Sequence, residues 1–451
     1  MHSNTRPGNV ADASVDDLLD RVGQSIDDGT VPVDIFNDPR IHELELKRIY
    51  GRCWVFVGHA SEIPEPGDYV LRYIGEDQFI LVRDEHGEIR LLLNSCRHRG
   101  SAVCRADRGN ASHFRCPYHA WVFKNSGEWN GAPHRRNAYR DLDPAEWSLL
   151  SAPNVDSIQG LIFASLDPEA PTLREYLGDM VWYLDAYLGV DPMGTSVVGD
   201  PHRWRVPANW KSGAENFIGD AYHVPSLHRS IEDIGAFPEI DAVIGAEFHV
   251  DVGKGQGMIM TPGGLPRPPW GILDCPPEVT EHFRLDGLLP EQREMIEHNT
   301  MVTFTIFPNL SYIASPIVAE PGSDPTAFMA LRQWQPRGPG QMDIWNWPMV
   351  WTSAPEEFKK ASYRGGVTYF SPSGMVEQDD TVAWAGAPVA GKSAFARANE
   401  MSFNLQLGHN GMSDYGYRTD WAGPGRASTS IYGERQQLDY YSRWLEEVTK
   451  P

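Results

Sequence analysis

Two short pairs of metal-binding side chains constrain this 451-residue chain more than any other feature of its sequence. The first pair is Cys96 and His98, and the second pair, after seventeen intervening residues, is Cys116 and His119. Thiolates and imidazoles are ligands of soft and borderline metals. A glycine and a proline next to the pairs suit tight turns, so we expect each pair on the loop of a β-hairpin.

Two kinds of metal site use two thiolates and two imidazoles. Structural zinc is one, but zinc fingers usually pair Cys with Cys and His with His. A Rieske [2Fe–2S] cluster is the other, with two cysteines on one iron and two histidines on the second, which raises the potential to roughly −150 to +300 mV against about −400 mV in plant-type ferredoxins. The mixed pairs favour the Rieske cluster. The remaining cysteines are expected to be buried apolar side chains: Cys53, Cys104 and Cys275.

A second group of candidate ligands lies near the middle of the chain. His223 and His228 are five residues apart, and Asp220 precedes the first by three. If residues 215–223 are helical, Asp220 and His223 share one face, and the carboxylate can hold the ring N–H that points away from a metal. Pro225 predicts a break in the helix between the histidines, and a broken helix can bring both to one site.

Two histidines need a carboxylate to form the 2-His-1-carboxylate triad of non-haem iron enzymes. The segment 370–380 offers Glu377, Asp379 and Asp380. Their spacing does not choose among them, because the first turn of any helix favours acidic side chains.

Together these motifs resemble the large (α) subunit of the Rieske non-haem iron aromatic-ring-hydroxylating dioxygenases of the naphthalene dioxygenase type. The resemblance covers most of the chain, through C-x-H with C-P-Y-H-A-W, then N-W-K, G-D-x-Y-H with a second His, and E-Q-D-D. It implies a cluster bound by Cys96, His98, Cys116 and His119. It also implies a mononuclear Fe(II) bound by His223, His228 and Asp380.

The resemblance further implies a catalytic role for Asp220, which would bridge the two metal centres, and for Asn216 beside it. A mostly apolar substrate pocket is expected around the iron. Its expected lining residues are Phe217, Ile218, Val224, Leu227, Phe370 and Val376.

The function implied is that of a terminal oxygenase subunit, which uses O₂ and electrons from a ferredoxin and an NADH-dependent reductase to cis-dihydroxylate an aromatic ring. The apolar pocket favours an aromatic or polycyclic aromatic hydrocarbon as substrate. A small β subunit in an α3β3 hexamer is implied by the resemblance alone.

Other functions stay open. A dioxygenase for an aromatic carboxylate, such as phthalate or terephthalate, would need a pocket cation, for which Arg229 and Arg364 are candidates. A Rieske monooxygenase or demethylase could use the same scaffold. An electron carrier with a non-catalytic C-terminal part would not need His223.

Length and charge set the remaining limits. A chain of 451 residues predicts more than one domain, and a net charge of −22 argues against nucleic acid as a partner. Residues 90–140 depart from that balance, with ten basic residues against two acidic ones. We expect this stretch to bind an acidic protein or to offset a buried anionic cofactor. With no signal peptide or membrane segment recognised, a cytoplasmic protein is expected.

The expected fold is α+β. Residues 1–50 form an N-terminal helical segment packed on the catalytic domain, 51–168 an antiparallel β Rieske domain, and 169–451 a helix-grip-type catalytic domain with an antiparallel sheet and helices. Periodicity predicts helices and strands. The helices expected are 14–28, 41–52, 172–189 and 434–448. The strands expected are 54–57, 69–74, 78–83, 89–94, 160–165, 301–314, 326–335 and 341–349. Residues 31–38 are expected to be extended, and 255–276 to be a long loop.

Overall fold

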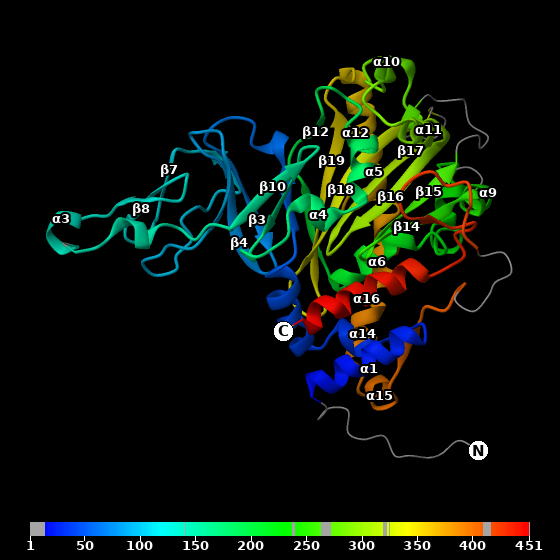
Figure 1. Cartoon of the computed structure of the whole chain (residues 1–451), viewed down its shortest axis with the longest axis horizontal. Helices are drawn as coiled ribbons and strands as arrows, with labels where there is room; N and C mark the ends of the chain where they lie inside the picture. The colour runs from blue at the N-terminus through cyan, green and yellow to red at the C-terminus, as the bar shows by residue number, and fades with distance from the viewer. Residues whose placement is uncertain are drawn as a thin grey trace. The chain divides into compact units, whose positions relative to one another are not determined.

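The protein is described by a computed structural model (Figure 1). The residues it describes are 14–139, 141–236, 240–262, 272–318, 323, 325–408 and 416–450. The chain forms two compact units, one of residues 50–176 and one of residues 1–49 together with 177–451. Both contain antiparallel sheet, and helices cover the sheet of the larger unit, which confirms the α+β class.

The smaller unit contains three antiparallel sheets with the orders β5-β4-β3-β6, β7-β8-β9 and β10-β11-β2. Its strands are β2 (Val55–His59), β3 (Asp68–Ile74), β4 (Asp77–Arg83), β5 (Ile89–Leu93), β6 (Arg108–Asn110), β7 (His113–Arg115), β8 (Val122–Lys124), β9 (Trp129–Gly131), β10 (Asn154–Ile158) and β11 (Leu161–Ser165). Apolar side chains from several strands share one core, among them Leu71, Ile80, Phe123 and Trp129. The five strands predicted in this part of the chain are therefore present, with ends shifted by one or two residues.

The larger unit is built on a nine-stranded antiparallel sheet with the order β12-β19-β18-β17-β16-β15-β14-β21, and β13 also pairs with β19. Its strands are β12 (Thr195–Val197), β13 (His202–Val206), β14 (Phe248–Gly253), β15 (Gln256–Pro262), β16 (Asn299–Ile306), β17 (Leu310–Ile317), β18 (Thr326–Pro336), β19 (Met342–Trp351) and β21 (Arg426–Ala427). A separate short pair joins β1 (Thr30–Pro32) to β20 (Ser402–Asn404).

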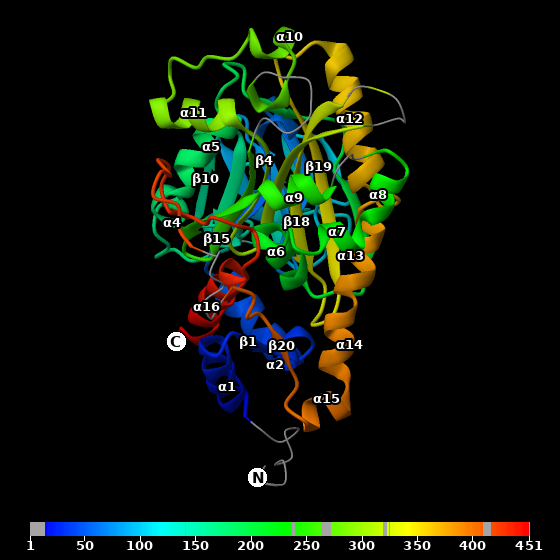
Figure 2. The same ribbon diagram turned by 90° about the vertical axis from the view of Figure 1, so that its right-hand side faces the viewer.

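Helices of the larger unit cover the sheet and extend beyond it. They are α1 (Val15–Asp27), α2 (Pro39–Leu44), α5 (Met180–Leu188), α6 (Trp210–Gly219), α7 (Val224–Leu227), α8 (Arg229–Asp233), α9 (Ile240–Ala246), α10 (Pro277–Thr280), α11 (Pro290–His298), α12 (Glu356–Phe370), α13 (Glu377–Trp384), α14 (Gly386–Lys392), α15 (Ala394–Ala398) and α16 (Arg435–Thr449). Figure 2 shows α12 to α15 following one another along one side of this unit. None of the helices described has both the length and the apolar character that a bilayer span requires.

Helix α6 lies against the middle of the sheet, where it packs on β15, β16, β17 and β18. A glycine allows the close approach, since a Cβ on Gly213 would lie 2.3 Å from the Trp334 ring of β18. Phe217, one turn later, also packs on Trp334, with ring centroids 5.2 Å apart. The end of α6 is therefore fixed on the sheet, and the candidate ligands follow directly after it.

Several sequence predictions are wrong in detail. Residues 172–189 form two helices, α4 (Leu173–Leu177) and α5, because Gly178 between them has a left-handed backbone with φ 56°. Residues 301–314 are not one strand, because β16 and β17 form a hairpin whose turn contains the Pro308–Asn309 pair, a common turn composition. Residues 256–262 of the predicted loop are strand β15, while 263–271 lie outside the described residues. The extended segment 31–38 continues only to Pro32 and then forms a 3₁₀ turn over Val33–Phe36.

The N-terminal and C-terminal helices behave as predicted. Ser14 caps α1 in a reciprocal capping box with Asp17, and α1 packs on α16. Next along the chain, α2 runs into a π-helical turn over Glu45–Tyr50. That turn places Glu45 in the interior, where it accepts hydrogen bonds from the indole N–H groups of Trp210 (2.9 Å) and Trp444 (2.8 Å).

Glu45 also neutralises a completely buried cation, the Nζ of Lys211 at 2.5 Å. Glu45→Leu should therefore lower the free energy of unfolding by about 3–5 kcal/mol, because it leaves the ammonium unpaired away from water. Urea denaturation measures this change. Glu43→Leu, at an exposed position two residues away, is the matched control and should change stability by about 0.5 kcal/mol or less. Equal losses in the two variants would contradict the pairing.

Candidate metal centres

The two predicted thiolate–imidazole pairs lie on loops with one shared hydrogen-bond pattern. The N–H of Cys96 donates to the carbonyl of Ser101 (2.8 Å), and the carbonyl of Cys96 accepts from the N–H of Gly100 (2.8 Å). Cys116 makes the same two bonds to the residues five and four positions later, at 2.8 and 3.1 Å. The fourth residue after each cysteine has a left-handed backbone, φ 72° at Gly100 and 54° at Ala120. Alanine rarely adopts that conformation, and such strain is typical of functional loops.

These loops bring the four predicted cluster ligands together. Both cysteines are buried, and the rings of His98 and His119 have centroids 4.5 Å apart. Their donor atoms do not converge on one point, since no three of the four side chains bring donor atoms within 4.8 Å of one another. One tetrahedral zinc would need such convergence, because its ligand bonds are only about 2.0–2.3 Å long. Donor atoms that do not meet at one point suit a cluster of two irons, in which two cysteines bind one iron and two histidines bind the other.

The surroundings of Cys116 and His98 favour their metal-binding forms, whereas burial raises the pKa of the Cys96 thiol. Burial raises the pKa of the Cys116 thiol, but the backbone N–H groups of Tyr118 and His119 outweigh it, and the pKa lies below its usual value. Burial, the nearby His119 and the charge of Arg99 lower the pKa of His98, which keeps the ring neutral. Hydrogen bonds to cluster sulfurs also tune the reduction potential.

Cys116→Ser should remove the cluster and its visible spectrum, because a hydroxyl is a poor ligand for an iron–sulfur centre. Absorption and EPR spectra of the purified variant measure this loss. Cys104→Ser is the control, since Cys104 is also buried but lies outside the two ligand pairs, with its thiol near the carbonyl of Ala106 (3.5 Å) and the Tyr69 side chain. A wild-type spectrum in Cys116→Ser would refute the Rieske ligand assignment.

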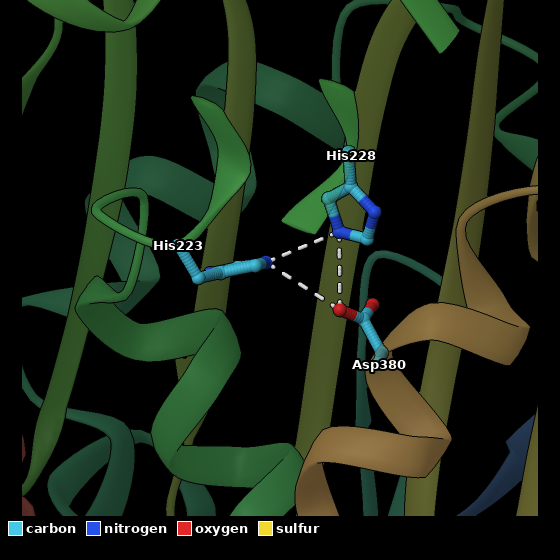
Figure 3. A group of neighbouring side chains, drawn as sticks. All are labelled: His223, His228 and Asp380. Atoms are coloured by element: carbon cyan, nitrogen blue, oxygen red, sulfur yellow. Dashed lines mark hydrogen bonds and ion pairs between the residues drawn. The ribbon is translucent and has the colours of Figure 1, made fainter. Parts of the chain in front are cut away.

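The second candidate centre is formed by His223, His228 and Asp380 (Figure 3). The Nε2 atoms of the two rings are 3.2 Å apart, and Oδ1 of Asp380 lies 3.4 Å from the first and 3.1 Å from the second. Figure 3 shows all three side chains pointing toward one another from different segments. Within the part of the chain that the structure describes, this is the single group of three or more such residues whose ligand atoms lie within 4.8 Å of one another.

The local backbone differs from the sequence prediction, although the predicted contact is present. Helix α6 ends at Gly219, so Asp220 is its C-cap and no regular helix continues to His223. The reason is a non-helical backbone at Asp220, with φ −98° and ψ 73°. Pro225 does not break a helix either. It occupies the first turn of α7, where a proline leaves no hydrogen bond unmade.

Each histidine of this centre has a second carboxylate behind its ring. Oδ2 of Asp220 lies 3.3 Å from Nδ1 of His223, and the amide of Asn216 lies 3.5 Å from both groups. Oδ2 of Asp379 lies 3.6 Å from Nδ1 of His228. Because a carboxylate bonded to Nδ1 fixes the tautomer of a ring, Asp220 allows His223 to present Nε2 to a metal. Asp379 lies beyond hydrogen-bond distance of the His228 ring, whose Nδ1 has no hydrogen-bond partner among the described residues.

Electrostatics at the centre favour positive charge. Burial by itself lowers the pKa of His223, but Asp220 and Asp380 outweigh it and raise this pKa to about 10. Burial raises the pKa of Asp380, yet His223 and His228 bring it down to about 2. A divalent cation among these side chains would be stabilised by the same carboxylates. Two imidazoles and one carboxylate are also the donor set of non-haem Fe(II).

The structure separates the three acidic candidates that spacing left open. Asp380 is 3% exposed and directs Oδ1 to both ring nitrogens. Glu377 is turned away and forms an ion pair with Arg332. Asp379 faces the far side of the His228 ring. Asp380 is therefore the carboxylate that could complete a triad.

A largely apolar cavity of ≈130 Å³ opens onto the triad. Of the predicted pocket residues, Asn216, Phe217, Val224, Phe370 and Val376 line it. Leu227 lines a different cavity, and Ile218 packs toward Gly257 of β15. The cavity is about as large as an engineered cavity of about 150 Å³ that holds benzene.

The sheet contributes lining residues that the sequence analysis missed. They include Ile259, Met301, Thr303, Ile313, Ser315 and Ile317 from three neighbouring strands. Alternation along each strand could show that one face is buried, but not that this face forms a pocket. Arg229 and Arg364, the candidate cations, do not line the cavity, and neither does any other Lys or Arg among the described residues.

A second cavity of ≈480 Å³ reaches the centre and shares four residues with the first: Asn216, Asp220, His223 and Asp380. Glu215 also lines it and accepts a hydrogen bond from the Tyr441 hydroxyl (2.8 Å). Burial raises the pKa of Glu215 to about 8, and the charge of Asp220 contributes to the rise. The triad is therefore bordered by an apolar cavity and by one with ionisable walls.

Comparison with known proteins matches these two centres to two domains. Residues 53–152 match the Rieske [2Fe–2S] domain, and residues 182–397 match the catalytic domain of the ring-hydroxylating alpha subunit. The N,N-dimethyl phenylurea N-demethylase subunit alpha of Sphingobium sp. (strain YBL2) is 38% identical over 446 residues, which is 97% of this chain and 95% of that protein. The chain belongs to the ring-hydroxylating alpha subunit family.

Other members of the family are also similar over nearly their whole length. The biphenyl dioxygenase subunit alpha of Metapseudomonas furukawaii is 32% identical, over 92% of this chain and 90% of that protein. The crystal structure of naphthalene 1,2-dioxygenase from Rhodococcus sp. bound to indole has a TM-score of 0.91 and 40% identity, over 96% of this chain and 99% of that chain. The protein is thus a Rieske non-haem iron oxygenase subunit, and members of this family work with electron-transfer partners and typically form multimers.

Proposed function

We propose that the protein is the large subunit of a terminal oxygenase that cis-dihydroxylates a neutral aromatic compound, with an aromatic or polycyclic aromatic hydrocarbon as the main candidate. The apolar cavity that meets the triad carries this proposal. An aromatic carboxylate is a weaker candidate, because the described cavity walls offer no Lys or Arg to pair with it. The family resemblance of the chain to naphthalene 1,2-dioxygenase supports the same reaction.

In the proposed mechanism, Fe(II) would be held by His223, His228 and Asp380, and the cluster would be held by Cys96, Cys116, His98 and His119. When bound, the iron supplies the centre at which dioxygen reacts, and the cluster supplies single electrons. The chain itself orients these groups. Asp220 fixes the His223 ring, while Phe217 and Phe370 place the substrate ring beside the triad and help to exclude water.

N-demethylation is the second candidate, and the 38% identity to a phenylurea N-demethylase subunit favours it. One experiment separates the two reactions. The purified protein, with ferredoxin, reductase and NADH, is supplied with naphthalene or with an N,N-dimethyl phenylurea under ¹⁸O₂. Dihydroxylation predicts a dihydrodiol carrying both labelled atoms, whereas demethylation predicts formaldehyde and a demethylated urea. Formation of the demethylated product alone would overturn the dihydroxylase proposal.

The proposed partners are an acidic ferredoxin, an NADH-dependent reductase and a small β subunit in an α3β3 hexamer. Sedimentation of the co-expressed subunits tests the hexamer.

We place the protein in the cytoplasm, the compartment that suits five cysteines without a disulfide.

The proposed ferredoxin surface includes the exposed residues Arg135 and Arg136. Arg140, the last basic residue of the predicted patch, lies outside the described residues. Arg136→Glu should slow reduction of the cluster by ferredoxin several-fold at low salt, and wild-type rates should fall as salt screens charges over about 8–10 Å. Stopped-flow reduction of the cluster measures both effects.

Lys360→Glu, an exposed charge reversal on α12, is the control and should leave the rate unchanged. Rates that do not depend on salt in the wild type would remove this role from the basic segment.

A further inference from the structure

A fully desolvated ion pair lies directly behind the substrate cavity and has no part in the mechanism above. Arg332 on β18 is 0% exposed, and its guanidinium donates to Glu377, which is 1% exposed, in the first turn of α13. Its Nε and Nη1, and Oε1 of Glu377, have no hydrogen-bond partner among the described residues. Burying a guanidinium with one anionic partner and unpaired donors costs desolvation free energy. This cost points to a role for the pair beyond stability.

The surroundings of Arg332 join it to the walls of the cavity. Its guanidinium carbon lies 5.3 Å from the ring centroids of both Phe217 and Phe370, which line the cavity from α6 and α12. It also lies 4.9 Å from the ring of Trp334 and 5.8 Å from that of Trp204. One cation therefore contacts both aromatic walls, at distances typical of cation–π attraction.

The other half of the pair reaches the triad. Glu377 and Asp380 are three residues apart in α13, about one helical turn, so anchoring the first also restrains the second. Asp380 also belongs to this short helix, so the position of α13 sets the distance between its carboxylate and the two imidazoles. With its Glu377 end fixed on β18, α13 cannot rotate or slide without breaking the buried pair.

We propose that Arg332 and Glu377 are positioning residues, which hold the Asp380 carboxylate at the iron-binding point and set the two aromatic walls of the cavity. The inference rests on the proposed iron site. Replacing a buried ion pair by apolar side chains of similar volume often leaves the stability of a protein unchanged or raised. If the pair served stability alone, such a replacement would change neither iron binding nor the cavity. Removal of both charges therefore separates folding from positioning.

The test uses the double variant Arg332→Met/Glu377→Leu in the full-length protein. We expect it to fold with the wild-type cluster spectrum and thermal midpoint. Its apparent Kd for Fe(II), measured by competition with a chelator, should rise about 10–100-fold, the usual effect of losing a partner that orients a metal ligand. KM for naphthalene should rise as well. Glu377→Gln leaves Arg332 unpaired and should show the same rise in Kd together with lower stability.

Arg205→Met is the control, since it removes an ion pair to Asp343 of β19 and Arg205 does not line the cavity. A double variant with wild-type Kd and KM would overturn the proposal. If the double variant does not fold, Arg332→Lys decides, because a lysine keeps the charge but loses the planar fork: an unchanged Kd would then overturn the proposal. A wrong assignment of the iron site would give a different result from a wrong assignment of Arg332 and Glu377. In that case Asp380→Ala would also retain its iron.

Discussion

Asp220→Asn should reduce turnover by about 100-fold while both metal centres stay filled. The variant keeps the size of the side chain but removes its charge and one acceptor oxygen. Asp220 is placed for more than a local role, because its Oδ2 faces Nδ1 of His223 and it lines both cavities. We propose that it also faces the His119 ring of a neighbouring subunit and so joins one subunit's cluster to the next subunit's iron.

The measurement for this variant is oxidation of a pre-reduced cluster in the presence of substrate and oxygen, together with iron content. The cluster should remain reducible by ferredoxin but oxidise very slowly. Asp241→Asn, at an exposed position, is the matched control and should behave as the wild type. A local role could be filled by Asn, because its side-chain oxygen can still accept from the His223 backbone N–H (3.3 Å in the Asp). Wild-type oxidation kinetics in Asp220→Asn would therefore leave Asp220 with that local role alone.

Asp380→Ala should lose most of the mononuclear iron, and with it nearly all oxygenation, whereas Asp379→Ala should keep most of both. The first substitution removes a carboxylate oxygen that lies 3.4 and 3.1 Å from the two Nε2 atoms. The second removes a group 3.6 Å behind the His228 ring, and such outer partners reduce metal affinity by about 10–100-fold without removing a ligand.

Iron analysis with correction for the cluster absorbance measures this difference. We expect one iron fewer per chain in Asp380→Ala, and the two cluster irons in both variants. The opposite ranking would move the ligand to Asp379, and equal retention of iron would remove the carboxylate from the site. Because the cluster lies in a separate compact unit, its spectrum serves as an internal control for folding of that unit.

The sequence predicts a metal centre best when the ligands of that centre lie close together in the chain. Cys116 and His119 are three residues apart on one loop, so spacing alone indicates their chemistry. Asp380 is more than 150 residues from His228, and chain spacing left it equivalent to Glu377 and Asp379. The family resemblance indicated Asp380, and the fold gives the physical reason, since α13 turns Asp380 toward both histidines, Glu377 toward Arg332 and Asp379 toward the far side of the His228 ring.

The errors in the sequence predictions have a similar cause, because they concern residues whose contacts form only when the chain folds. Strand β16 continues into β17 through a two-strand hairpin that apolar periodicity could not distinguish from one long strand, although Pro308 gave a signal. Part of the cavity wall comes from strands that pair side by side only after folding, so no local pattern could name Ile259 or Thr303. The buried partner of Glu377 was missed for the same reason, because Arg332 is 45 residues away in the chain.

The central claim is that the cluster and the triad work as one oxygenase, and a single turnover without electron donors tests it most directly. The purified protein, with its cluster reduced and its reductant removed, is mixed with oxygen and an aromatic substrate. We predict that cluster oxidation requires substrate, that oxygenated product forms in proportion to the cluster oxidised, and that a sample stripped of mononuclear iron forms none. Cluster oxidation without product, or equal product from the stripped sample, would contradict the account.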